Sequence, residues 1–180
     1  MSSVSKNPIR GRGARDKGSR AERKVRDILR RIYPPEKRDR VYRVPLSGGG
    51  AIKGDVADNN DYDSCYEVKN QETLKLNDWW RQAKNQAGGS RTPVLVVTQA
   101  FRPFYFILRA SDWLPILDKT EYCSFQNLCK VGTGTTFFDD MAKLEERDLG
   151  HIFLDGDECV VISEQYYVDV KTSIYEQSNV

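Results

Sequence analysis

The chain has 180 residues, of which 39% are hydrophobic, and this suits one domain of ordinary size better than two. No apolar run approaches the ~18 residues of a membrane span, and the N-terminus lacks the apolar stretch of a secretory signal. One histidine and four scattered cysteines, without a Cys-x-x-Cys pair, argue against a zinc site, a disulfide framework and histidine-based acid–base catalysis. We therefore expect a reduced, cytoplasmic protein with free thiols.

Charge is segregated along the chain, although the net charge is only +2. Residues 1–55 hold 16 Lys and Arg against 6 Asp and Glu, whereas residues 56–180 hold 12 against 20. A basic first third favours a polyanionic partner such as nucleic acid. A basic tail without a specific partner is the alternative.

The first third of the chain predicts a basic arm and a helix. Residues 1–17 combine Gly, Ser, Pro and Arg with little apolar surface to bury, so we expect a flexible basic arm. Apolar residues at spacings of three and four then predict a helix that Ser19 caps. Tyr33-Pro34-Pro35 ends this helix, because proline cannot continue it.

The rest of the chain alternates strand and helix patterns. Strands are expected at 41–44, 65–69, 93–98 and 104–109, helices at 74–87 and 111–117, and a hairpin at 152–162 that turns at Asp155-Gly156. A Gly-rich loop at 47–50 and a polar connection at 58–63 separate the first strands. This order predicts an α/β fold with a central mixed β-sheet flanked by helices. Its core spans residues 18–118, and residues 119–180 form an acidic C-terminal extension packed on the core.

Four charged residues within 50 positions suggest phosphodiester chemistry: Glu22, Asp55, Glu67 and Lys69. Glu67 and Lys69 project to one face of a strand, and a hairpin would bring Asp55 beside Glu67. Clustered carboxylates repel one another unless a cation offsets their charge, and an all-oxygen ligand set suits Mg²⁺. A lysine beside a metal-bound water can orient that water or help to deprotonate it.

Each of these residues also has an ordinary structural interpretation. Glu-x-Lys on a strand is usually a solvated face, an aspartate after Gly54 is usually a turn residue, and Glu22 can be a capping partner. Ser47-Gly48-Gly49-Gly50 alone is an ordinary flexible turn. Trp79 and Trp80 can stack on bases, but paired tryptophans on an amphipathic helix are more often core.

In its order of motifs, the chain resembles the PD-(D/E)XK nuclease superfamily, and more closely the archaeal-type Holliday junction resolvases. The resemblance lies in Gly18-Ser19-Arg20-Ala21-Glu22-Arg23, Arg43, Ser47-Gly48-Gly49, Gly54-Asp55-Val56, Tyr66-Glu67-Val68-Lys69 and the strand from Pro93 to Val97. It covers roughly residues 18–100 and implies a restriction-endonuclease-like core. Gly54 stands where the family usually has proline, and residues 119–180 have no counterpart in the resemblance.

The resemblance implies a role for each of these residues. Metal ligands would be Glu22, Asp55, Glu67 and the backbone carbonyl of Val68, with Lys69 assisting the attacking water and Ser47 near the scissile phosphate. The implied metal is Mg²⁺, for which Mn²⁺ would substitute. DNA contacts would come from Arg20, Arg23, Arg43, Ser47, Gly48, Gly49 and Gln82, although an exposed helical glutamine is the plainer interpretation of Gln82.

The sequence therefore predicts a metal-dependent endonuclease that hydrolyses phosphodiester bonds at four-way DNA junctions. The alternatives are a restriction-like or flap-processing nuclease of the same superfamily and a DNA-binding module without catalysis. Cutting two symmetric strands calls for a homodimer, and an exposed aromatic cluster is expected as its interface at Phe101, Phe104, Tyr105 and Phe106. The alternative is that residues 119–180 cover this cluster within one chain. The family also implies a prokaryotic or phage source.

Overall fold

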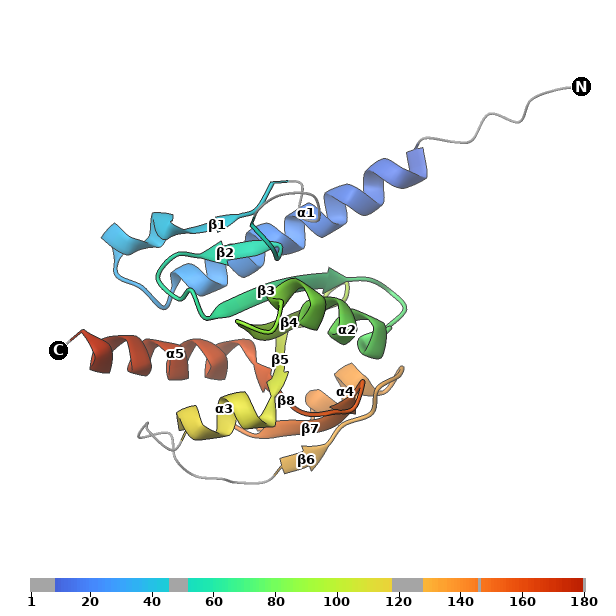
Figure 1. Ribbon diagram of the computed structural model, residues 1–180. Coiled ribbons are helices and arrows are strands. Elements are labelled where there is room, and N and C mark those ends of the chain that lie inside the picture. Colours follow the sequence, from blue (N-terminus) through green and yellow to red (C-terminus); the bar gives the residue numbers. More distant parts are fainter. Residues whose placement is uncertain (1–8, 46–51, 118–127, 146, 180) are drawn as a thin grey trace, which may run out of the picture.

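The computed structural model describes residues 9–45, 52–117, 128–145 and 147–179 (Figure 1). The helices are α1 (Ile9–Arg30), the 3₁₀ helix η1 (Pro35–Arg40), α2 (Leu76–Ala87), α3 (Ala110–Leu117), α4 (Phe137–Met141) and α5 (Glu164–Ser178). The strands are β1 (Val41–Arg43), β2 (Val56–Asp58), β3 (Ser64–Asn70), β4 (Thr92–Thr98), β5 (Tyr105–Arg109), β6 (Leu128–Lys130), β7 (Leu149–Leu154) and β8 (Asp157–Ser163). In these ranges no helix is both long and apolar enough to cross a membrane.

The strands form one mixed sheet in the order β1-β2-β3-β4-β5-β8-β7-β6. β3 pairs with β4 in parallel, with Glu67 opposite Leu95 and Lys69 opposite Val97. β6 and β7 are also parallel, and the other neighbours are antiparallel. The predicted α/β fold with a central mixed sheet flanked by helices is confirmed.

Alternate residues of the central strands enter two apolar cores, one on each face of the sheet. Tyr66 and Val68 of β3 face the core shared with α1 and α5. Leu95 and Val97 of β4 face the other core, which α2 and α4 cover. This alternation follows from the pleat of a strand, and it places Glu67 and Lys69 on the α2 face of β3.

Helix α1 begins at Ile9, so the predicted start at Ser19 is wrong. The helix runs through the boundary expected at residue 17 and extends beyond the body of the domain (Figure 1). Ser19 lies within this helix, where it accepts a hydrogen bond from Arg43 Nη2 at 3.2 Å instead of capping. The rest of the expected arm, residues 1–8, lies outside the described residues.

The aromatic cluster expected to lie on the surface is buried within the chain, except for Phe101. Phe104, Tyr105 and Phe106 are at most 8% exposed, because β8 pairs with β5 and the adjacent helices cover both faces. Phe106 stacks on Tyr167 of α5 with ring centroids 4.1 Å apart. The interface argued from these three residues is therefore wrong.

The C-terminal segment lies within the central sheet. β8 pairs with β5 and continues into β7 and β6, while α5 joins the core of α1. The hairpin predicted at 152–162 is confirmed, and Asp155 and Gly156 both have positive φ, at 46° and 85°. Residues 119–127 of the expected extension lie outside the described residues.

Candidate active site

The β2–β3 hairpin holds Asp55 directly beside the Glu-x-Lys strand. The Asp55 backbone N–H donates to the carbonyl of Tyr66 at 2.8 Å, and its carbonyl accepts from the N–H of Val44 at 2.9 Å. Its side chain accepts a hydrogen bond from the N–H of Val68 at 2.8 Å through Oδ2. Strand contacts on both sides thus fix the Asp55 carboxylate at the level of Glu67 and Val68.

The same contact orients the backbone of Val68. In a β-strand, the N–H and C=O of one residue point toward the same neighbouring strand. The N–H of Val68 points at Asp55, so its carbonyl oxygen lies on the Asp55 side of β3 as well. β2 pairs with β3 through Val56 and Tyr66, and Val68 lies beyond that pair.

Gly54 has a conformation that the proline of the usual motif cannot adopt. Its φ is +93°, and a Cβ atom there would lie 2.9 Å from the carbonyl oxygen of Tyr66. Its N–H donates to Oε1 of Gln86 on α2 at 3.2 Å. The departure from the family pattern at this position therefore has a local structural reason.

Glu67, Lys69 and Gln82 form a closed set of contacts between β3 and α2. The Lys69 ammonium lies 2.7 Å from Oε1 of Glu67 and donates to Oε1 of Gln82 at 3.0 Å. The amide nitrogen of Gln82 donates to the same Glu67 oxygen at 2.6 Å. Gln82 thus contacts both residues of the Glu-x-Lys pair, although much of its side chain is exposed to solvent.

The second carboxylate oxygen of Glu67 is buried and has no hydrogen-bond partner among the described residues. The Glu67 side chain is only 2% exposed, and burial together with the charge of Asp55 raises its pKa, while Lys69 opposes that rise. The charge of Glu22 also raises the pKa of Glu67, by less than the charge of Asp55 does. An unpartnered buried carboxylate oxygen is costly, and a cation bound beside it would satisfy it.

Glu22 points toward β1. Its Oε2 accepts from Nε of Arg43, whose Nη2 bonds Ser19. Among the described residues, no three acidic, histidine or cysteine side chains are gathered closely enough to hold a metal ion. Asp55 and Glu67 are thus together, and Glu22 is held nearby by an arginine.

The predicted DNA-binding residues lie around this group. Arg20 and Arg23 are exposed on α1, and Arg43 is half-buried beside Glu22. Ser47, Gly48 and Gly49 lie outside the described residues. Trp79 and Trp80 are 5% and 0% exposed, so both belong to the core and neither presents a ring to solvent.

Sequence reasoning missed two polar contacts of this site. Gln86 reaches Gly54, and Ser19 reaches Arg43, across 32 and 24 positions of the chain. Gln86 follows Gln82 by four positions and thus lies on the same face of α2. That spacing is the one pattern by which Gln86 is recognisable.

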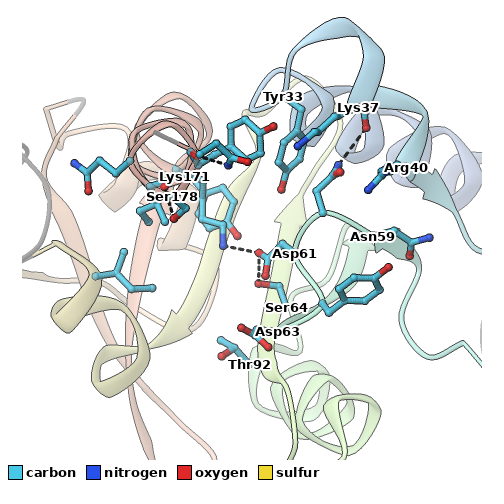
Figure 2. Close-up of a pocket in the computed structure, with 18 of the residues that line it drawn as sticks. Tyr33, Lys37, Arg40, Asn59, Asp61, Asp63, Ser64, Thr92, Lys171 and Ser178 are labelled. Atoms are coloured by element: carbon cyan, nitrogen blue, oxygen red, sulfur yellow. Dashed lines mark hydrogen bonds and ion pairs between the residues drawn. The ribbon is translucent and has the colours of Figure 1, made fainter.

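A cavity of about 820 Å³ lies at the opposite end of β3, away from these carboxylates (Figure 2). It opens between α5, η1 and the β2–β3 turn, and Asp61, Ser64 and Lys171 lie together in its wall. Asp55, Glu67 and Lys69 are not part of its lining. The candidate site therefore lies toward the C-terminal end of β3, and this cavity is not part of it.

A mixed sheet between helices, with an aspartate beside a Glu-x-Lys strand, defines a nuclease of the PD-(D/E)XK superfamily with a restriction-endonuclease-like fold. The family model described as "Phage putative PDDEXK endonuclease" matches residues 13–149, and the chain belongs to this family. The match includes all the candidate site residues. It is a phage endonuclease family, and not the archaeal-type Holliday junction resolvases that the motifs resemble.

Neither the curated proteins nor the solved structures contain a match to this chain. The family match supports the nuclease class and a DNA substrate.

Proposed function

We propose that the chain is a divalent-metal-dependent DNA endonuclease whose catalytic centre is Asp55, Glu67 and Lys69. The observation that carries this proposal is the buried, unpartnered oxygen of Glu67 beside the Asp55 carboxylate. Two carboxylates that share a buried site repel each other, and a bound cation relieves both that repulsion and the unmet hydrogen-bonding capacity. Asp112 Oδ2 is also buried without a hydrogen-bond partner, but it lies 3.5 Å from Nη1 of Arg109, whereas the Glu67 oxygen lies beside a second carboxylate, whose charge helps to raise the pKa of Glu67.

Mg²⁺ or Mn²⁺ would be held by Asp55, Glu67 and the backbone carbonyl of Val68. Glu22 would become a further ligand when Arg43 releases it and turns toward a DNA phosphate. When bound, such an ion activates a water and stabilises negative charge on the phosphate. Lys69, positioned by Glu67 and Gln82, orients the attacking water. Ser47 contacts the scissile phosphate, and Gly48 and Gly49 allow the backbone to approach it closely.

We further propose that Arg20, Arg23 and Arg43 contact the DNA phosphates on either side of the cut. Arg20 and Arg23 are exposed one turn apart on α1, close in sequence to Glu22. Arginine suits this role because its planar fork matches phosphate oxygens. Gln82, already bonded to Glu67 and Lys69, stays inside the catalytic group as a positioning residue.

Branched DNA, and a four-way junction in particular, is the narrower part of the proposal and rests on the motif resemblance. A homodimer would accompany it, because one active site cannot reach two symmetric strands. Sedimentation equilibrium gives the subunit number directly. A species near 20.6 kDa would argue against the junction, and one near twice that mass would support it.

Cleavage of three DNA substrates tests the function. Four-way junction, flap and linear duplex are each incubated with the protein in Mg²⁺, Mn²⁺, Ca²⁺ or excess EDTA. We expect cutting in Mg²⁺ and Mn²⁺, and weak or no cutting in Ca²⁺. Cleavage that continues in EDTA would contradict the metal site, and binding without cleavage in every metal would leave the DNA-binding module as the better interpretation.

A further inference from the structure

The turn between β4 and β5 presents an aromatic side chain that the fold does not use. Phe101 is fully exposed, at 107% of its reference area, while its three aromatic neighbours at 104–106 are buried. Its φ is +62°, in the left-handed region. A bulky side chain in this region is a genuine outlier.

The geometry of this turn would ordinarily select glycine. The N–H of Arg102 donates to the carbonyl of Gln99 at 3.1 Å, which closes a four-residue turn with Phe101 in its third position. Of the two central residues, only Phe101 has positive φ, which is the pattern of a type II turn. Glycine or asparagine is usual at that position. A phenylalanine there adds strain and exposes an apolar ring, so it is unfavourable on two counts.

The turn is nevertheless built rigidly. The hydroxyl of Thr98, which is 3% exposed, donates to the carbonyl of Arg102 at 2.9 Å and lies 3.2 Å from that of Gln99. The guanidinium of Arg102 lies 2.8 Å from Oδ1 of Asp139 on α4. Contacts on both sides of Phe101 therefore hold the backbone of the turn in place, and backbone strain that the surroundings maintain is typical of functional positions.

This turn lies at the same edge of the sheet as the candidate active site. β3 and β4 are parallel, so Asn70, which follows Lys69, pairs with Thr98 at the start of the turn. The amide of Gln99 donates to the carbonyl of Glu72 at 2.7 Å, and Lys17 of α1 pairs with the Glu72 side chain. In Figure 1 the arrowhead of β3 and the N-terminal half of α1 point to this same side.

We propose that Phe101 stacks on the face of a nucleobase of the bound DNA, as a wedge beside the cleavage site. Base–aromatic stacking is favourable for every base, because every base has a π-face on which an aromatic ring can lie. The strand from Leu95, opposite Glu67, to Gln99 spans about 13 Å at ~3.3 Å per residue. A base that Phe101 contacts therefore lies close to the cleavage site. This inference rests on the proposed nuclease function.

Binding of the full chain to DNA in Ca²⁺, measured by fluorescence anisotropy, tests the wedge apart from catalysis. The probes are a four-way junction, a flap and a linear duplex. Phe101→Gly removes the ring and also relieves the positive φ, so its melting temperature should equal or exceed that of the wild type. We expect the same variant to lose affinity by about 5- to 140-fold, the range measured for loss of one stacked base.

Companion variants separate stacking from other contacts. Phe101→Tyr should keep affinity within about threefold, whereas Phe101→Leu, which is apolar without a π-face, should lose it as Phe101→Gly does. Phe153→Ala, at an aromatic that is 63% exposed on β7, is the matched control and should bind as the wild type does. A 2-aminopurine base, placed in turn at each of the positions that flank the cut, should change its fluorescence at one of them with the wild type and at none of them with Phe101→Gly.

The results show whether the stacked base is unpaired at a branch or belongs to an opened duplex step. They also separate failure of the wedge from failure of the proposed nuclease function. A loss confined to junction and flap identifies an unpaired base at the branch, and a loss shared by linear duplex identifies a base step that the protein opens. Wild-type affinity in Phe101→Gly, or in Phe101→Leu alone, would overturn the wedge and leave the nuclease proposal standing. Failure of the wild type to bind any of the three DNAs would overturn both.

Discussion

Gln82 joins the two residues of the Glu-x-Lys pair through one amide group. Its oxygen accepts from Lys69 and its nitrogen donates to Glu67, so it fixes which carboxylate oxygen of Glu67 stays unpartnered. In the proposed metal centre Glu67 is a ligand, and side chains that orient a metal ligand commonly contribute 10- to 100-fold to metal affinity or activity.

We expect Gln82→Ala to lower the cleavage rate about 10- to 100-fold, with a rise in the Mg²⁺ concentration needed for half-maximal rate. Asn85→Ala, on an exposed position of the same helix, is the matched control and should cleave as the wild type does. A Gln82→Ala rate indistinguishable from that control, at limiting and at saturating Mg²⁺, would show that the amide does not position Glu67.

Gly54 allows a separate prediction about the backbone beside Asp55. Alanine there would place Cβ 2.9 Å from the Tyr66 carbonyl oxygen in addition to the strain of a positive φ. We expect Gly54→Ala to reduce the free energy of unfolding by about 1–3 kcal/mol, measured by urea denaturation. Gly89→Ala has a similar φ of +75° with no neighbour within 4 Å, so it reports the φ effect alone and should cost less. Equal losses would show that the Tyr66 contact relaxes freely.

At the scale of single residues, the sequence predicted the strand carboxylates and missed their supporting contacts. Asp55, Glu67 and Lys69 were recognisable because strand alternation and a hairpin are local rules. Gln86 and Ser19 were not, because their partners depend on how α2 and α1 pack against the sheet. The predicted cap at Ser19 failed for a related reason: propensity alone placed the helix start too late.

At the scale of elements, α5 contacts the β2–β3 hairpin through polar groups that are half-buried at Asp61, Ser64 and Lys171 and buried at Tyr66 and Tyr167. Lys171 pairs with Asp61 in the β2–β3 turn, and Asp61 accepts from the hydroxyl of Ser64 at 2.8 Å (Figure 2). The hydroxyls of Tyr66 and Tyr167 lie 3.0 Å apart across the same region. The C-terminal helix thereby supports the hairpin that carries Asp55 and Glu67.

We expect Lys171→Met to destabilise the fold by about 1–3 kcal/mol, because it leaves the half-buried Asp61 carboxylate without its cation. The double variant Asp61→Asn/Lys171→Met should recover at least half of that loss. Lys143→Met, in an ion pair whose lysine is 74% exposed, is the control and should change stability by less than about 1 kcal/mol. A loss in Lys171→Met no larger than in this control would contradict the structural role of the pair.

The same pair gives a pH dependence with a definite sign. Burial alone would raise the pKa of Asp61, but Lys171 and Ser64 hold that pKa below its ordinary value of 3.8. A carboxyl with a lowered folded pKa stabilises the fold above its unfolded pKa, and this stabilisation is lost as the pH falls through the folded pKa. The stability advantage of the wild type over the double variant should therefore persist at pH 5–7 and decline below about pH 4. An advantage that stays constant down to pH 2 would contradict this assignment.

The sequence predicted elements well where their signals were local. The Asp155-Gly156 turn is typical of a two-residue hairpin, and the apolar run at 93–98 is typical of a strand buried on both faces. Helix α5 was missed because its buried residues are nearly consecutive and do not recur at the three- and four-residue spacing of an amphipathic helix. They are Tyr166, Tyr167, Val168 and Val170. Tertiary packing against β5 and α1 decides its conformation.

At the scale of the whole molecule, charge and shape are matched to a polyanion. The basic first third forms α1, whose N-terminal part extends beyond the sheet on the side of the candidate site (Figure 1). Residues 119–180, with 12 acidic against 5 basic groups, supply β6, β7 and β8 at the far end of the strand order from β1, together with α4 and with α5, which packs against α1. The projecting N-terminal part of α1 is therefore the candidate surface for a polyanion.

Neutralising the projecting turns of α1 should reduce the salt dependence of DNA binding. We expect the triple variant Arg10→Gln, Arg12→Gln, Arg15→Gln to lower the slope of log K against log salt by about 0.9 for each DNA phosphate that the variant no longer neutralises. Glutamine is a good helix former, so circular dichroism should show α1 retained. The double variant Lys130→Gln, Lys143→Gln is the control, with an unchanged slope expected. If the slope of the triple variant also stays unchanged, Arg20, Arg23 and Arg43 are the better candidates for binding phosphate.

The central claim is that Asp55 and Glu67 hold the catalytic metal, and one comparison tests it most directly. Cleavage and binding of the same DNA are measured for the wild type, Asp55→Asn and Glu67→Gln, with cleavage in Mg²⁺ and binding in Ca²⁺. We expect each variant to lose roughly 100-fold or more in cleavage rate, while binding is kept or strengthened because a carboxylate that repels phosphate is gone. Parallel loss of binding and cleavage, or near-normal cleavage by either variant, would contradict the claim.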